Sequence, residues 1–208
     1  MSNQTRERPI LFNTEMVRAI LDGEKMVTRR PIKPQYAEQT GGIKIPLDDF
    51  AKDCDIADFS PYSIGDRLWV RETWYKFASC EGCMCDEEPE DQSGCYFYKA
   101  EHELYEGERW RPSIHMPREA ARLFLRVTDV RAERLQNITV DDVRKEGVKF
   151  KVPVPVGDKD YVFCSEMEAF GAFGHLWDST VEKSELNRYG WAANPWVWVI
   201  EYEREEQP

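Results

Sequence analysis

Four cysteines lie close enough together in the sequence to bind one metal ion. Cys80, Cys83, Cys85 and Cys95 follow the pattern Cys-x2-Cys-x-Cys-x9-Cys, and the first pair has the spacing of zinc ligands. Four thiolates would hold together an acidic insertion at residues 78–95 that has almost no apolar core. The tight second gap, and the lack of a second Cys-x2-Cys pair, favour the alternative of a loop with incidental thiols. Structural zinc is therefore one of two interpretations, and no cofactor is expected for catalysis.

A second group of residues with binding chemistry surrounds His115 in the segment SIHMP. Arg111 and Arg118 flank it, so the histidine could contact a ligand, although a hydrogen-bonded structural histidine explains it equally well. Aromatic rings stack on nucleobases. Three tryptophans are the expected members of a pocket wall: Trp69, Trp74 and Trp110.

Composition and charge limit the class of protein. The 208 residues are 41% hydrophobic and 32% charged, which is typical of a globular protein, and we expect one domain over 1–208. The net charge of −11 argues against a protein that coats long nucleic acid. Basic residues nevertheless cluster near residues 25–33, so a nucleoside or a short single strand of RNA is the better partner. No apolar run spans a membrane and the first residues resemble no secretory signal, which predicts a cytoplasmic protein with reduced thiols.

Several elements can be predicted from pattern. Asn13 is a good N-cap for a helix over 14–22 that Gly23 ends, and an extended segment over 25–30 follows. Strands are expected over 68–74, 96–99, 123–131 and 196–202, the last apolar on both faces and therefore central. The pair Thr139 and Asp142 resembles a capping box that opens a helix to Glu146.

A second such pair, Ser165 and Glu168, predicts a helix to about Trp177, with Met167, Phe170 and Phe173 facing inward. The whole pattern lacks a βαβ rhythm. It favours an α+β, mostly β protein: a mixed-to-antiparallel barrel with short peripheral helices, an insertion at about 78–95 and a loop and helix insertion at about 150–190.

The segment Gly23-Glu-Lys25-Met-Val-Thr28-Arg-Arg30 resembles the motif Gly-x-Lys-x-x-Glu-x-Arg of the ASCH domain, with Thr28 in place of the glutamate. The segments TRRPIK, RLWVRETW, WRPSIHMP and NPWVWVIE look like the longer ASCH proteins of bacteriophages and prophages. The resemblance covers most of residues 9–30, 64–77, 110–148 and 191–204. It implies a PUA-like β-barrel that recognises a nucleobase or nucleoside, with Arg30 and Arg71 among the ligand-binding residues.

The departure at Thr28 is itself informative. The small ASCH-type N4-acetylcytidine amidohydrolases use a lysine, a threonine three residues later and a more distant glutamate, and Lys25, Thr28 and Glu72 reproduce this set in type and order. The resemblance implies Thr28 as nucleophile, Lys25 as its activator and Glu72 as proton donor to the leaving amine. In a regular strand residues 25 and 28 point to opposite faces, so this interpretation requires a bend between them.

Three functions remain open from the sequence. The first is an amidohydrolase that acts on N4-acylated cytidine, and the second is a non-catalytic protein that binds RNA or a modified base. The third is a phage accessory protein that acts through a protein partner on its acidic surface. Ribonuclease activity has been associated with the ASCH type, but the sequence offers no histidine pair for it.

Overall fold

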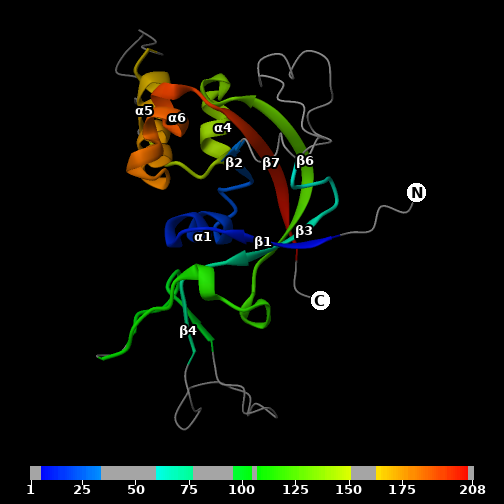
Figure 1. Ribbon diagram of the computed structural model, residues 1–208. Coiled ribbons are helices and arrows are strands. Elements are labelled where there is room, and N and C mark those ends of the chain that lie inside the picture. The colour runs from blue at the N-terminus through cyan, green and yellow to red at the C-terminus, as the bar shows by residue number, and fades with distance from the viewer. Residues whose placement is uncertain (1–5, 34–59, 77–95, 105–106, 151–162, 206–208) are drawn as a thin grey trace, which may run out of the picture.

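The computed structural model describes residues 6–33, 60–76, 96–104, 107–150 and 163–205. The central element is a five-stranded mixed sheet (Figure 1) with the strand order β1-β3-β6-β7-β2. Its strands are β1 (Glu7–Leu11), β2 (Val27–Pro31), β3 (Arg67–Arg71), β6 (Phe124–Arg134) and β7 (Trp196–Glu205). The pair β1 and β3 is parallel and the other pairs are antiparallel. A separate hairpin joins β4 (Trp74–Lys76) to β5 (Tyr96–Tyr98).

The sheet is strongly curved (Figure 1), and helices cover both of its faces. The helices are α1 (Thr14–Leu21), α4 (Val140–Lys145), α5 (Phe163–Thr180) and α6 (Leu186–Tyr189). Helix α1 packs against one face, and α4 and α5 pack against the other. Short 3-10 turns connect the elements at Ser113–His115, Arg118–Ala120, Leu135–Asn137, Lys183–Glu185 and Trp191–Ala193. None of the helices in these ranges is long and apolar enough to cross a membrane.

Strand β7 lies between β6 and β2, and it is buried on both faces because an apolar core packs against each face. Trp198 and Ile200 belong to the core that α1 covers, whereas Val197 and Val199 belong to the core under α4 and α5. The predicted central position of this strand is therefore confirmed. Since β2 pairs with β7, its residues alternate in the same way: Thr28 lies opposite Ile200, Arg29 opposite Val199 and Arg30 opposite Trp198.

Two helices form where the capping residues predict them. The Asn13 side chain accepts a hydrogen bond from the Met16 amide at 2.8 Å, which satisfies one of the free amides in the first turn of α1. Thr139 and Asp142 form the expected capping box of α4. Gly147 then ends this helix with a φ of +78°, a conformation that glycine adopts without the steric cost of a side chain.

The predicted start of the long C-terminal helix is wrong. Helix α5 begins at Phe163, so Ser165 lies inside it and does not cap it. A Ser-x-x-Glu pair also fits within a helix, because neither residue type prevents a further helical turn. The inward position of Met167 is also wrong, since this side chain is 73% exposed. Ala169, Phe173 and Trp177 form the buried stripe instead, at intervals of four residues.

The fold class is α+β with a mixed sheet, as expected, but the described strands form an open sheet and not a closed barrel. Within these strands β1 and β2 are the two edges, and no ladder joins them. The Cys-rich insertion at 78–95 lies outside the described residues.

Candidate functional site

Two adjoining pockets lie where the edge strands β1 and β2 face each other. One contains Thr28 and holds about 420 Å³; the other contains Trp198 and holds about 560 Å³. We name them the Thr28 pocket and the Trp198 pocket, and together the edge cleft. Five residues line both: Leu11, Arg29, Arg30, Trp177 and Thr180. Both volumes are in the range of small-molecule sites, roughly 300–1,000 Å³.

Arg30 spans the edge cleft. Its Nη2 donates a hydrogen bond to the carbonyl of Leu11 at 2.6 Å, so this side chain reaches from β2 to β1 across the open side of the sheet. The guanidinium also lies over the ring of Phe12, 5.3 Å from the centroid. One edge of Arg30 is thus held by the protein, and the residue borders both pockets.

The Thr28 pocket has a polar floor. Thr28 is 3% exposed and lines this pocket together with Glu146. Its hydroxyl makes no hydrogen bond to any residue that the structure describes. Helix α5 supplies the apolar wall through Phe173, Leu176 and Trp177. A hydroxyl without a partner beside an apolar wall is suited to a planar ligand with one polar edge.

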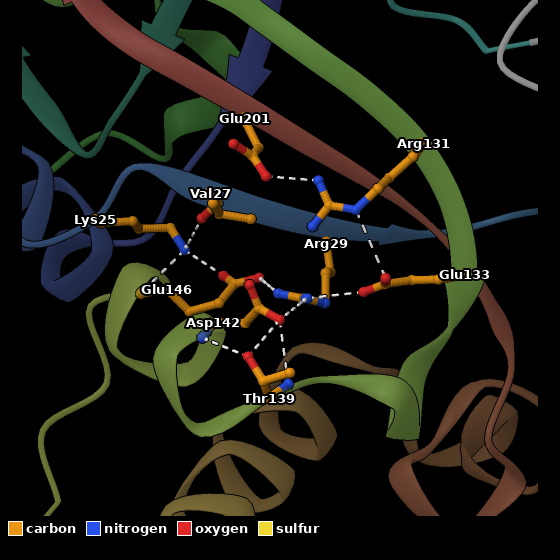
Figure 2. A network of polar contacts seen from close by, with 9 residues as sticks. All are labelled: Lys25, Val27, Arg29, Arg131, Glu133, Thr139, Asp142, Glu146 and Glu201. Atoms are coloured by element: carbon orange, nitrogen blue, oxygen red, sulfur yellow. Dashed lines mark hydrogen bonds and ion pairs between the residues drawn. The ribbon is translucent and has the colours of Figure 1, made fainter.

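Lys25 lies beneath this floor, and its ammonium group donates three hydrogen bonds to Val27 and Glu146 (Figure 2). Its Nζ donates to the Val27 carbonyl at 2.9 Å, to the Glu146 carbonyl at 3.0 Å and to Glu146 Oε2 at 2.5 Å. An ammonium group has three N–H donors, and these three acceptors use them all. Burial lowers the pKa of Lys25, and the Glu146 carboxylate opposes this effect. No hydrogen bond joins Lys25 to Thr28.

The second oxygen of Glu146 binds Arg29. Arg29 Nη1 donates to Glu146 Oε1 at 3.0 Å, and its Nη2 donates to Glu133 at 2.8 Å (Figure 2). Asp142 lies 3.5 Å from the same guanidinium. Burial acts to raise the pKa of Asp142, but hydrogen bonds from Thr139 and the charge of Arg29 leave it below its ordinary value. These contacts attach α4 to β2, and they place the Glu146 carboxylate at the Thr28 pocket.

Glu72 is held elsewhere. Its two carboxylate oxygens accept hydrogen bonds from Arg122 Nε at 2.9 Å and Nη2 at 3.1 Å, and its amide contacts the Met116 sulfur. The side chain is 1% exposed and does not line the edge cleft. Burial raises the pKa of this carboxyl, while Arg122 acts in the opposite direction. No hydrogen bond or ion pair therefore joins any two of Lys25, Thr28 and Glu72 in this structure.

The predicted ligand-binding residues divide in two. Arg30 and Arg71 line the edge cleft, whereas His115 is exposed in a 3-10 turn outside it. The three predicted wall tryptophans lie outside it as well: Trp69 lies under Arg71 and Arg118, Trp74 is buried in a third apolar cluster, and Trp110 does not line either pocket. Trp177 and Trp198 are buried in the apolar cores and also form part of the cleft wall.

Sequence reasoning missed Glu146. Its position at the end of a capped helix carries no signal of pairing with Lys25, which lies 121 residues earlier. Among the residues that the structure describes, no group of three or more histidine, cysteine, aspartate or glutamate side chains is arranged to hold a metal ion. The four predicted zinc ligands, Cys80, Cys83, Cys85 and Cys95, lie outside the described ranges.

Comparison with known proteins adds one similarity. No family model matches the chain, and no curated protein matches it. The crystal structure of an ASCH domain from Lactobacillus crispatus JV V101 aligns with 96% of this chain and 79% of its own chain, at 11% sequence identity and a TM-score of 0.41. An identity and a TM-score of this size establish neither a common fold nor a common function. The description of the edge cleft therefore rests only on the residues of this chain.

Proposed function

We propose that this chain is an ASCH-type domain whose edge cleft binds a nucleoside, alone or at the end of a short single strand of RNA. The observation that carries the proposal is the Thr28 pocket, in which an unpartnered hydroxyl and the Glu146 carboxylate lie beside an apolar wall. Nucleobases are flat, and their edges carry hydrogen-bond donors and acceptors. An apolar wall binds the face of such a ring, while Thr28 and Glu146 bind its edge.

The network beneath the pocket supports binding more directly than catalysis. Lys25 and Arg29 hold both oxygens of Glu146, so the carboxylate is fixed in place before a ligand arrives. A preorganised polar group gives specificity because no free energy is spent on ordering it when the ligand binds. We infer that Lys25 and Arg29 position Glu146 for recognition.

The proposal is tested by nucleoside binding to a Thr28→Val variant. Valine has nearly the same shape as threonine but lacks the hydroxyl, so we expect cytidine affinity to fall about 5- to 10-fold, as for one lost neutral hydrogen bond. Isothermal titration calorimetry measures the affinity, and Trp177 beside the pocket provides a fluorescence signal. Thr128→Val is the matched control, because Thr128 is exposed and lies outside the edge cleft. Equal affinities for wild type and Thr28→Val would contradict the proposed role of the hydroxyl.

Hydrolysis of N4-acetylcytidine is the second candidate function, favoured by the unpartnered Thr28 hydroxyl. In this scheme the Thr28 oxygen attacks the acetyl carbon and its proton passes to neutral Lys25. The C–N bond then breaks as Glu72 protonates the leaving amino group of cytidine, and water cleaves the acetyl ester on Thr28 to release acetate. Burial favours neutral Lys25, but the ammonium must first give up its three present acceptors. Glu72 must likewise leave Arg122.

Chromatographic detection of cytidine released from N4-acetylcytidine decides between the two functions. Turnover that disappears in Thr28→Val and Glu72→Gln establishes the enzyme, and Thr128→Val is again the control. Binding of N4-acetylcytidine without turnover establishes recognition alone. For an RNA strand, we expect salt-sensitive binding that Arg30→Ala weakens.

A further inference from the structure

We propose that the Trp198 pocket is a phosphate subsite, so that the ligand of the edge cleft is a nucleotide and not a bare nucleoside. This inference rests on the proposed function and extends it to the second pocket. Its basis is a set of buried N–H groups without acceptors, all on residues that line this one pocket.

Three nitrogen donors on residues of the Trp198 pocket have no hydrogen-bond partner in the structure: Nε of Arg30, Nε of Arg71 and Nε1 of Trp198. The Arg29 side chain points to the opposite face of β2, where it pairs with Glu133 and Glu146. Trp198 is only 2% exposed and its Nε1 is buried, so solvent does not supply a partner for the indole N–H. Buried donors are almost always satisfied in proteins, and a group of them around one cavity indicates an acceptor that is bound there.

The charges on the sheet side of the pocket favour an anion. Arg30, Lys33 and Arg71 line it, and none of them forms an ion pair with a carboxylate of the described chain. Arg30 and Trp198 are direct neighbours across β2 and β7, so both side chains lie on the same face of the sheet. Phosphate offers several strong acceptor oxygens, and guanidinium groups bind it by charge-assisted hydrogen bonds.

Two carboxylates line the opposite side. Glu182 and Glu185 border the pocket from the segment after α5, and neither forms an ion pair with Arg30, Lys33 or Arg71. The pocket thus has a cationic sheet side and an acidic helix side. A nucleotide matches this division, because its phosphate needs donors and its ribose hydroxyls need acceptors. Inorganic sulfate or phosphate alone would leave the two glutamates without a role.

The arrangement of the two pockets fits one nucleotide. They meet at Arg30, with the Thr28 pocket on one side and the donors of the Trp198 pocket on the other. A base at Thr28 would place its sugar beside Arg30 and its phosphate toward Arg71. The phosphate could be the monoester of a free nucleotide or the diester of a strand, and both would use the same donors.

Calorimetric titration with cytidine, cytidine monophosphate and inorganic phosphate tests this inference. We expect the monophosphate to bind at least about tenfold more tightly than cytidine, as charge-assisted hydrogen bonds to phosphate contribute strongly. Arg71→Ala should remove most of this advantage. Lys33→Ala is a second variant that disturbs no hydrogen bond or ion pair of the described chain, and it should reduce the advantage as well. Arg126→Ala, an exposed arginine outside the edge cleft, is the matched control.

The outcomes separate this inference from the proposed function. Equal affinities for cytidine and its monophosphate would overturn the phosphate subsite and leave nucleoside binding intact. Phosphate binding that depends on Arg71, with no cytidine binding, would support the subsite and contradict the proposed function. Binding of none of the three ligands would overturn both. A dinucleoside monophosphate then identifies the source: tighter binding than the mononucleotide assigns a strand, and weaker binding assigns a free nucleotide.

Discussion

Replacement of Glu146 by glutamine is expected to destabilise the fold strongly. The two side chains have nearly the same size and shape, and the substitution only exchanges one carboxylate oxygen for an amide NH2 group. The Glu146 carboxylate binds Lys25 with one oxygen and Arg29 with the other, and the Lys25 side chain is completely buried. A glutamine retains one carbonyl oxygen, which can still accept from Lys25. Its amide group presents N–H donors to Arg29, which is itself only a donor. One charge-assisted hydrogen bond is therefore lost, and two buried cations lose their shared counter-charge.

The magnitude follows from these contacts. A hydrogen bond to a charged group contributes about 1.5–3 kcal/mol, and removal of one partner from a buried ion pair costs about 3–5 kcal/mol in all. Arg29 keeps Glu133 as a partner, so we expect a loss of about 3 kcal/mol in the free energy of unfolding. For a chain of this size the melting temperature should fall by about 6–12 °C.

Urea unfolding at pH 7, followed by circular dichroism, measures the difference. Glu201→Gln is the matched control: Glu201 pairs with Arg131 at 2.5 Å, but its side chain is 32% exposed. A partly exposed pair contributes about 0–1 kcal/mol, so this variant should stay close to the wild type. If Glu146→Gln also lies within 1 kcal/mol of the wild type, the buried network does not stabilise the attachment of α4 to β2, and the reasoning is refuted.

Four further outcomes are expected. Asn13→Ala should lower the free energy of unfolding by about 1 kcal/mol in urea titrations, because it removes the cap of α1. Gly147→Ala should lower the free energy of unfolding by about 1–3 kcal/mol, because the φ of Gly147 is +78° and a Cβ there would lie 2.8 Å from the Cβ of Ala19. Gly171→Ala is the control, since open space surrounds Gly171 and the substitution should not destabilise the protein. The pKa of Asp142 is lower in the folded state than its ordinary value of 3.8, so the ionised carboxylate stabilises the fold above about pH 3.8 and this stabilisation is lost as the pH falls through the folded-state pKa. Asp142→Asn should therefore reduce the difference in the free energy of unfolding between pH 5 and pH 3. Elemental analysis of protein purified without added zinc should find about one zinc per chain if residues 80–95 bind it, and less than about half an equivalent would reject the site.

The local elements were predictable because their signals lie in short stretches of sequence. Asn13 and Gly23 mark the two ends of α1, and Thr139 with Asp142 marks the start of α4. Strand β7 reads as central because apolar residues occupy both of its faces. Capping and burial of this kind depend on neighbours within a few residues or on simple alternation.

The candidate site was predictable only in part. Thr28, Arg30 and Arg71 were expected at a ligand site, and all three line the edge cleft. Trp198 lies in the core, as its place on an apolar central strand suggests, but a core residue can also form the wall of a pocket that opens beside it. Glu72 directly follows Arg71 in the sequence, yet its hydrogen-bond partner is Arg122, 50 residues away.

The sequence by itself determined the local elements and the types of residue that are available for chemistry: a lysine, a threonine and arginines within the short segment 25–30. Only the tertiary structure decided what each of them does. The curvature of the sheet brings its two edges together and creates the edge cleft, and α4 brings Glu146 to Lys25. Pairing between residues over a hundred positions apart leaves no local pattern, because it depends on where whole elements pack and not on the order of residues around each partner.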